Sequence, residues 1–282
     1  MRVLITGAGG QLGQDLVTAF AGWDVVAADH RLLDVGDRDA VLGGITSLRP
    51  DAVVHAAAWT AVDACEADPD RAWRVNALGS RHVADACRRT GAHLCAISTD
   101  YVFDGTSPTP YTEWDAPNPL SVYGRTKLAG ERETLALVPG ALIVRTSWVC
   151  GAGGSNFVKT MLRLAAGDGD VTVVDDQHGC PTFTVDLAGM VRQLVAGRHV
   201  GVFHVTNQRP TTWWGLARDV FAAAGADPER VLPIPTDRLD PPRPAPRPAN
   251  SVLDNAALRL MGIGLLADHQ ESLERLVKEL IG

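Results

Sequence analysis

The chain has 282 residues, 46% of them apolar and 21% charged, which is typical of a globular protein with a substantial core. Its formal charge of −7 argues against nucleic-acid binding, which normally requires a basic face. No apolar run approaches the ~18 residues of a membrane span, and the N-terminus lacks a signal-peptide pattern. We therefore expect a cytoplasmic protein without nucleic-acid or membrane partners.

The first structural signal is a short apolar run, residues 2–6, that ends abruptly in Gly7-Ala8-Gly9-Gly10-Gln11-Leu12-Gly13. Apolar residues then recur at helical spacing through Phe20, so the segment reads as strand, tight turn and helix. Glycines in such a turn let the backbone approach a pyrophosphate, which the first free N–H groups of the helix attract. This context predicts a dinucleotide site.

A second apolar run, Val25 to Ala28, ends in Asp29, about 20 residues after the glycines, where a ribose-binding acid is expected. An acid there favours the free 2′-hydroxyl of NAD. His30 and Arg31 follow directly and could pair with the additional phosphate of NADP. The cofactor is therefore NADPH or NADH, with the choice left open.

Strands and helices alternate along the following chain, and this pattern predicts a parallel sheet with right-handed crossovers. Small residues after the strand at 52–55 leave room for a ligand at the strand end, where Asp34 and Thr60 could touch the cofactor. A long helix over 69–89 is expected to bury Trp73, Ala77, Val83, Ala84 and Cys87. We expect strands near residues 2, 24, 52, 93 and 141, with the sixth at Val171–Val174, and a final strand at 201–205.

The expected fold is α/β, a Rossmann-type doubly wound parallel sheet with a smaller C-terminal substrate-binding region. Residues 1–149 would bind NAD(P), completed by about 167–205, and residues 150–166 with 206–282 would bind substrate. Trp213 and Trp214 are expected to pack inside the latter. Adjacent acids on a strand point to opposite faces, so Asp175, Asp176 and His178 do not suggest a metal site.

A tyrosine and a lysine four residues apart form the strongest catalytic signal. Tyr123 and Lys127 fall on one face of a predicted helix, so the ammonium could lower the pKa of the phenol and make it a proton donor. Upstream, Ser98-Thr99-Asp100 follows a strand, and Thr99 could donate a hydrogen bond to a substrate oxygen or cap the turn. The proline-rich run 240–248 is either a surface connector or a substrate-side strap whose arginines meet phosphate.

Together these motifs resemble those of the extended short-chain dehydrogenase/reductases, and more closely the dTDP-4-dehydrorhamnose reductase family. The resemblance covers nearly the whole chain. Its narrowest motifs are Ser98-Thr99-Asp100-Tyr101-Val102-Phe103-Asp104-Gly105 and Arg145-Thr146-Ser147-Trp148.

The resemblance implies NAD(P)H-dependent reduction of the 4-keto group of dTDP-4-dehydro-β-L-rhamnose. Tyr123 would protonate the alkoxide, Lys127 would hold the nicotinamide ribose, and Thr99 would orient the ketone. Substrate would also contact Asp100, Tyr101 and Trp148, and the Arg247 segment would close over the nucleotide. Cofactor contacts would come from Gly7, Gly10, Gln11, Leu12, Gly13, Asp29, Asp34, Val35, Ala57, Ala58, Thr60, Tyr123 and Lys127.

Some family members hold magnesium at a dimer contact formed by glutamates. Here the early position is Asp15, and the sequence identifies no later acids to match it. We therefore expect no metal, and either a monomer or a homodimer.

Three alternatives bear on function. A nucleotide-sugar dehydratase would carry a glutamate base after the Thr-Asp pair, where this chain has Tyr101. A regulatory subunit similar to that of methionine adenosyltransferase would not need Thr99, Tyr123 and Lys127, which are all present. A reductase of another nucleotide-linked 4-keto-6-deoxy sugar could share every one of these residues.

Overall fold

Six parallel strands form the central sheet of the computed structural model, which describes residues 1–282. Their order across the sheet is β10-β5-β4-β3-β1-β2. The strands are β1 (Arg2–Thr6), β2 (Asp24–Ala28), β3 (Ala52–His55), β4 (His93–Thr99), β5 (Leu142–Thr146) and β10 (Gly201–His204). Most are continuous apolar runs, as expected of strands covered on both faces, and the order reverses next to β1 as in a Rossmann fold.

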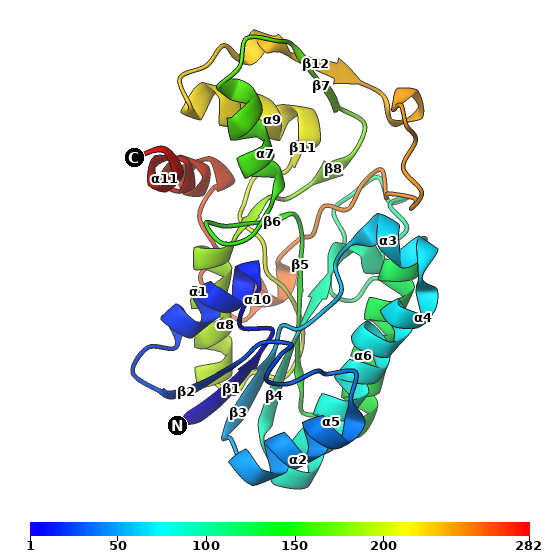
Figure 1. Cartoon of the computed structure of the whole chain (residues 1–282), viewed down its shortest axis with the longest axis vertical. Coiled ribbons are helices and arrows are strands. Elements are labelled where there is room, and N and C mark those ends of the chain that lie inside the picture. The colour runs from blue at the N-terminus through cyan, green and yellow to red at the C-terminus, as the bar shows by residue number, and fades with distance from the viewer.

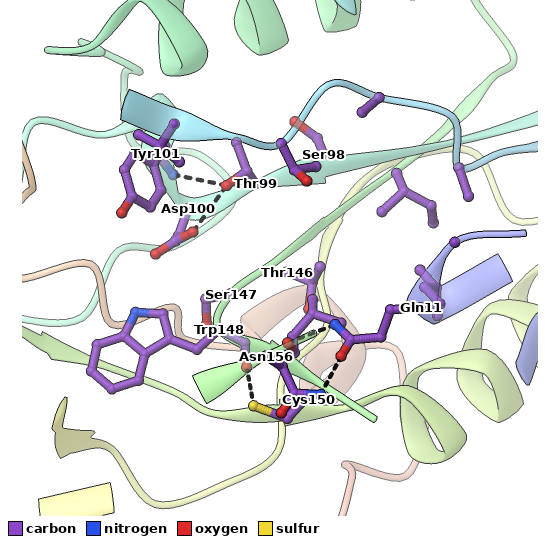
Figure 2. A pocket seen from close by; sticks show the side chains of 18 of the residues that line it. Gln11, Ser98, Thr99, Asp100, Tyr101, Thr146, Ser147, Trp148, Cys150 and Asn156 are labelled. Carbon is purple, nitrogen blue, oxygen red and sulfur yellow. Dashed lines mark hydrogen bonds between the residues drawn. The ribbon is translucent and has the colours of Figure 1, made fainter. Parts of the chain in front are cut away.

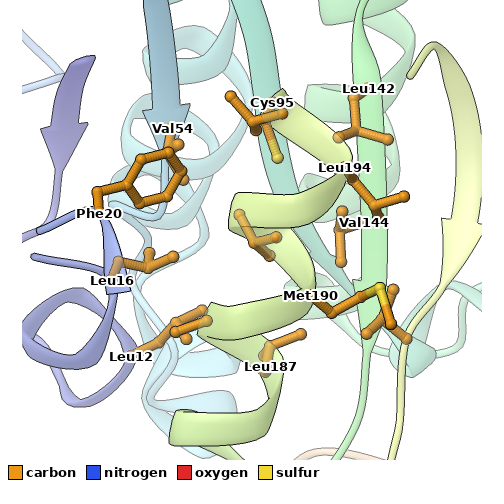
Figure 3. Close-up of a cluster of buried hydrophobic side chains, with 14 of the residues drawn as sticks. Leu12, Leu16, Phe20, Val54, Cys95, Leu142, Val144, Leu187, Met190 and Leu194 are labelled. Atoms are coloured by element: carbon orange, nitrogen blue, oxygen red, sulfur yellow. The ribbon is translucent and has the colours of Figure 1, made fainter. Parts of the chain in front are cut away.

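Helices cover both faces of this sheet (Figure 1). One side carries α1 (Gln11–Ala19), α8 (Thr184–Ala196) and α10 (Ala256–Leu260), and the other carries α2 (Arg38–Leu48), α5 (Gly79–Thr90) and α6 (Val122–Leu137). Figure 3 shows Leu12 and Leu16 of α1, and Phe20 just after it, packed over the strands together with Leu187 and Leu194 of α8. A second cluster of buried apolar residues lies between the sheet and α2 and α5. The predicted α/β class with a doubly wound parallel sheet is confirmed.

The sixth strand was assigned wrongly. Residues Val171–Val174 form β7, but β7 pairs with β12 (Val231–Ile234) away from the central sheet. The sixth position is taken by β10, which pairs with β5. Both segments are short apolar runs, and pattern alone does not determine which partner a strand finds.

A smaller region lies above the sheet in Figure 1 and has a core of its own. Its helices are α7 (Phe157–Ala165), α9 (Trp213–Ala223) and α11 (His269–Ile281). Besides β7 and β12, its strand pairs are β6 (Val149–Cys150) with β9 (Thr182–Phe183), and β8 (His178–Gly179) with β11 (Thr211–Thr212). The carboxyl ends of the central strands face this region, which positions a cavity between the two.

The predicted helix over 69–89 is interrupted. It consists of α4 (Pro69–Ala72), a π-helical turn at Trp73–Leu78, and α5, and it follows the short α3 (Val62–Ala67). Ala77, Val83, Ala84 and Cys87 are buried as expected, but Trp73 is 44% exposed. A π turn holds more residues than an α turn, so it shifts the buried stripe of the helix around its axis.

All five cysteines are buried and unpaired. Buried free cysteines of this kind pack as small apolar core residues.

Candidate active site

The carboxyl ends of β1, β3, β4 and β5 open onto one cavity of about 440 Å³. The structure brings most of the predicted site residues to this cavity. Those that line it are Gly7, Gly10, Gln11, Leu12, Gly13, Ala58, Thr60, Thr99, Asp100, Tyr101, Tyr123, Lys127 and Trp148.

The glycine turn at the start of α1 fits a pyrophosphate. Gly7 has φ +70°, and a Cβ there would lie 2.7 Å from the backbone of Ala57. A Cβ on Gly13 would lie 2.1 Å from the carbonyl oxygen of Gly7, so only glycine permits this tight turn. Gly10 caps α1 without a side-chain hydrogen bond, which leaves the first N–H groups of the helix free to bind a phosphate.

Four predicted cofactor residues are not part of the cavity wall: Asp29, Asp34, Val35 and Ala57. Asp29 follows β2 next to the glycine turn, and a Cβ on Gly9 would lie 3.4 Å from its Cβ. Its Oδ1 accepts hydrogen bonds from the N–H groups of Arg31 and Leu32 at 2.9 and 3.0 Å. These bonds hold the pKa of Asp29 below its ordinary value, so it is anionic.

Asp34, Val35 and Ala57 make contacts with other residues of the fold. Asp34 accepts from the N–H of Gly36 at 2.9 Å, and Val35 is buried, with its carbonyl oxygen 3.0 Å from Nδ1 of His82. Ala57 packs against Gly7.

Gln11 uses its side chain to join the two parts of the molecule. Its Nε2 donates to the carbonyl oxygen of Val149 at 2.9 Å, and its Oε1 accepts from Asn156 Nδ2 at 2.6 Å and from the N–H of Gly151. Figure 2 shows Gln11 reaching Asn156 across the cavity wall. The Gln11 side chain therefore fixes the loop that precedes α7.

Thr99 and Asp100 form a hydrogen-bonded pair at the end of β4 (Figure 2). The Thr99 hydroxyl donates to Asp100 Oδ1 at 3.0 Å and accepts from the N–H of Tyr101 at 3.2 Å. Asp100 is 2% exposed, and its Oδ2 has no partner. Burial raises the pKa of Asp100 to about 6, so this carboxyl group beside the cavity is ionised at neutral pH and protonated below about pH 6.

Tyr123 and Lys127 both lie on α6 and both reach the cavity. The predicted lowering of the phenol pKa is wrong for this structure: burial raises the pKa of Tyr123, and a hydrogen bond with Thr99 opposes it only in part. The spacing was right, but removal of the phenolate from water dominates the pKa of the phenol. Tyr123 is consequently a neutral phenol at neutral pH, with its ring edge to face with that of Tyr101.

Burial also acts on the cations and bases around α6. It lowers the pKa of Lys127 to about 8, against the favourable charge of Glu131. His55 is buried, with Nδ1 2.8 Å from Thr6 Oγ1 and Nε2 3.2 Å from Ser80 Oγ. Burial lowers the pKa of His55 to about 3, so it is a neutral, satisfied strand-end histidine.

Trp148 lines the first cavity, next to which lies a second cavity of about 440 Å³. It has φ +47°, an uncommon conformation for a bulky residue. Its indole lies over Gly179, where a Cβ would come within 2.4 Å of the ring, and it stacks on Trp213 with centroids 3.6 Å apart.

Trp213 was expected only to pack, but it also lines both cavities. Trp214 packs as predicted, donating from Nε1 to the carbonyl oxygen of Val231.

The second cavity lies between the small region and the proline-rich run. Tyr101, Phe157 and Trp213 line both cavities, so the two adjoin. Arg247, a predicted substrate residue, lines the second cavity together with Arg243. Two guanidinium groups beside an apolar wall suit a ligand with both an anionic part and a flat ring.

Comparison with known proteins bears on this arrangement. The family model described as the RmlD substrate binding domain matches residues 1–281. A dTDP-4-dehydrorhamnose reductase from Streptomyces griseus is 47% identical over 93% of this chain and 88% of its own length. The chain belongs to the dTDP-4-dehydrorhamnose reductase family.

Two further relatives inform the site. A dTDP-4-keto-6-deoxy-D-glucose reductase from Streptomyces niveus is 45% identical, covering 93% of this chain and 91% of its own. A crystal structure of dTDP-4-dehydrorhamnose reductase from Bacillus anthracis in complex with NADP has a TM-score of 0.95 and 39% identity, covering 99% of each chain.

Several residues that line the first cavity were not predicted from the sequence. Ser155, Asn156 and Phe157 enter the wall from the start of α7, where Asn156 caps the helix by accepting from the N–H of Lys159. An asparagine before an apolar helical run, following a glycine-rich loop, is the signal that could have found them. Ser251 also acts on Asp100 by lowering its pKa, although it lies 151 positions further along the chain.

No three His, Cys, Asp or Glu side chains gather closely enough to hold a metal ion. Asp175 instead accepts from Thr212 Oγ1 at 2.6 Å, and Asp176 accepts from the N–H of Thr236 at 2.8 Å. Asp15 lines a separate cavity of about 220 Å³ with Asp186 and Glu279, neighbours that the sequence did not reveal.

No helix of the protein combines the length and apolar character needed to cross a bilayer.

Proposed function

We propose that this protein reduces the 4-keto group of dTDP-4-dehydro-β-L-rhamnose to give dTDP-β-L-rhamnose, using NADPH or NADH, in dTDP-rhamnose biosynthesis. The observation that carries the proposal is the first cavity, where a glycine turn suited to a dinucleotide meets Thr99, Tyr123 and Lys127. Family membership is consistent with that chemistry.

The cofactor would be held by the glycine turn and the uncapped start of α1, with Asp29 beside the ribose. When bound, the reduced nicotinamide supplies a hydride. Lys127 would hold the nicotinamide ribose. Its ammonium has three donors, of which one bonds the carbonyl oxygen of Ile97 at 2.7 Å, so two remain for a ligand.

Tyr123 would donate the proton that completes the reduction. Its raised pKa keeps the hydroxyl protonated, and an alkoxide is far more basic than a phenolate, so proton transfer to the alkoxide is favourable. Thr99 would turn its hydroxyl from Asp100 to the ketone oxygen and orient the carbonyl. Asp100 and Tyr101 would then contact the sugar from the same strand end.

The second cavity would take the nucleotide. Its β7 wall offers Thr172, Val173 and Val174 beside a base, and Arg243 and Arg247 carry the charge that a diphosphate needs. We also propose the expected division, with cofactor on residues 1–149, completed by about 167–205, and substrate on 150–166 and 206–282. We make one amendment: β7, at 171–174, is grouped with the substrate-binding region, because it pairs with β12 and not with the central sheet.

A second candidate is reduction of another dTDP-linked 4-keto-6-deoxy sugar. The observation in its favour is the relative named dTDP-4-keto-6-deoxy-D-glucose reductase, whose 45% identity is close to the 47% of the dTDP-4-dehydrorhamnose reductase. A dehydratase is disfavoured because Tyr101 stands where the base would be. A regulatory role is disfavoured because Thr99, Tyr123 and Lys127 all line one cavity.

We also propose that the protein works in the cytoplasm as a monomer or homodimer. Its five free, buried cysteines suit a reducing compartment, where reduced nicotinamide and nucleotide sugars are available.

The test is oxidation of NADPH and NADH, in parallel, by purified protein with dTDP-4-dehydro-β-L-rhamnose formed in place by the preceding enzymes. The proposal expects substrate-dependent oxidation and dTDP-β-L-rhamnose as product. The same assay with other dTDP-linked 4-keto-6-deoxy sugars separates the two candidates by their kcat/KM values. No oxidation with any of these sugars would contradict both.

A further inference from the structure

The proline-rich run 240–248 descends from the small region and lies against α3, on the sheet side of the molecule (Figure 1). Three of its residues converge on one carboxylate there. Arg247 donates to Asp63 Oδ1 and Oδ2 at 2.5 and 2.7 Å, and the N–H of Ala245 donates to Oδ1 at 3.1 Å. Arg243 lies 3.8 Å from Oδ2.

Asp63 is the main polar anchor of this run. Every hydrogen bond from residues 240–248 to another segment ends on Asp63, apart from the contact of Arg247 with the Tyr101 side chain. Five prolines in the run supply no N–H groups, so the backbone has few other means of attachment. Within the run, this carboxylate is therefore the main polar attachment, and residues 249–251 directly after it bond Gly105 and His178.

The same two arginines line the second cavity. Asp63 carries one negative charge against their two positive charges, so it holds both guanidinium groups while leaving a net positive charge beside the cavity. Arg247 is nearly buried, with a side chain 11% exposed, and is held on two sides by Asp63 and Tyr101. Such a fixed guanidinium binds an anion without first losing side-chain freedom.

We propose that Asp63 is a positioning residue for the nucleotide part of the substrate: it holds Arg247 and Arg243 at the second cavity so that they bind the diphosphate. This inference rests on the proposed function for the identity of the ligand. Asp63 itself does not line either cavity, so it acts through the arginines.

This role predicts a specific kinetic pattern. Loss of the anchor weakens binding of the sugar nucleotide, while Thr99, Tyr123 and Lys127 keep their positions around the reacting carbonyl. The KM for the sugar nucleotide should therefore rise with little change in kcat, and the KM for NADPH should not change.

Asp63→Asn tests the inference, because it keeps the shape of the side chain and removes its charge. We expect the Kd for dTDP, measured by calorimetry, and the KM for the sugar nucleotide to rise on the order of ten-fold. The kcat should stay within about three-fold. Asp63→Glu, which restores the charge, should recover part of the affinity.

Asp254→Asn is the matched control. Asp254 forms a two-point pair with Arg259 at 2.7 and 3.0 Å, and its side chain is 31% exposed, against 35% for Asp63. It lines neither of the two adjoining cavities. This control variant should lose a comparable ion pair and leave both the Kd for dTDP and the KM unchanged.

A double-variant cycle then separates positioning from general stability. If Asp63 acts through Arg247, Asp63→Asn should change the Kd for dTDP little in an Arg247→Ala background. An unchanged Kd in Asp63→Asn alone, equal losses for dTDP and NADPH, or full additivity with Arg247→Ala would each overturn the inference.

The two proposals can fail separately. Binding of dTDP needs no turnover, so a wild-type protein that binds dTDP but reduces no keto-sugar would refute the proposed function and leave the Asp63 test intact. A wild-type protein that is active, with an Asp63→Asn variant indistinguishable from it, would refute only the positioning role.

Discussion

Lys127 Nζ donates a hydrogen bond to the carbonyl oxygen of Ile97, 2.7 Å away. Ile97 lies two residues before Thr99 on β4, and Lys127 lies four residues after Tyr123 on α6. One bond therefore ties the strand that carries the hydroxyl of Thr99 to the helix that carries the phenol. Lys127 holds this arrangement from within the cavity wall, where its own charge is costly.

The pH dependence of activity should reflect the lowered pKa of Lys127. Burial lowers the pKa of Lys127 to about 8, so its ammonium is present below that pH and is lost above it. Because kcat/KM for NADPH reports groups of the free enzyme, it should fall as the pH rises through about 8. Lys127→Met should lower kcat/KM at neutral pH and remove this fall. A fall that persists unchanged in Lys127→Met would assign it to another group.

Asp100 should lower the stability of the protein at neutral pH. Its pKa is raised to about 6 by burial, so the folded state holds the proton more tightly than the unfolded state. The stability that this provides is full below the unfolded pKa and is lost as the pH rises through about 6. Asp100→Asn should therefore raise the free energy of unfolding at pH 8 by on the order of 2 kcal/mol, and by less at pH 5.

Urea unfolding of Asp100→Asn at the two pH values measures this effect. Asp254→Asn provides the contrast, because Arg259 holds the pKa of Asp254 below its ordinary value and removing that charge should destabilise the protein. The Asp100 variant should also lose activity, since the sugar contact is changed. A variant that is less stable than wild type at pH 8 would refute the account of Asp100.

Asp29 should set the choice between the two nicotinamide cofactors. Its carboxylate is anionic and close to the glycine turn, so it would repel the 2′-phosphate of NADPH. Asp29→Asn keeps an oxygen that can accept from Arg31 and Leu32 but removes the charge. The ratio of kcat/KM for NADPH to that for NADH should rise several-fold, and an unchanged ratio would remove Asp29 from this role.

The local signals in the sequence were enough to predict much of the site. The glycine turn, the strand ends and the four-residue spacing of Tyr123 and Lys127 are each encoded in a short segment, and the structure brings them to one cavity. The first five strands follow from the same local patterns. The parallel sheet then brings their carboxyl ends together.

What the sequence did not reveal depends on distant partners or on burial. β7 and β10 look alike as apolar runs, and only their pairing partners distinguish them. The bond between Asp63 and Arg247 joins residues 184 positions apart. The pKa of Tyr123 depends on how completely the fold encloses the phenol, which helical spacing alone does not convey. Trp73 is not buried as predicted, because the π-helical turn at this point rotates the buried face of the helix.

The central claim, reduction of a sugar ketone with Tyr123 as proton donor, is tested most directly by following deuterium. Wild-type protein and Tyr123→Phe are incubated with dTDP-4-dehydro-β-L-rhamnose and a reduced nicotinamide cofactor that carries deuterium at the position transferred as hydride. NMR of the sugar should show deuterium at C4 with wild type. Tyr123→Phe should retain the cofactor Kd but form product at least about 100-fold more slowly. Absence of deuterium at C4 with wild type, or normal turnover by Tyr123→Phe, would contradict the account.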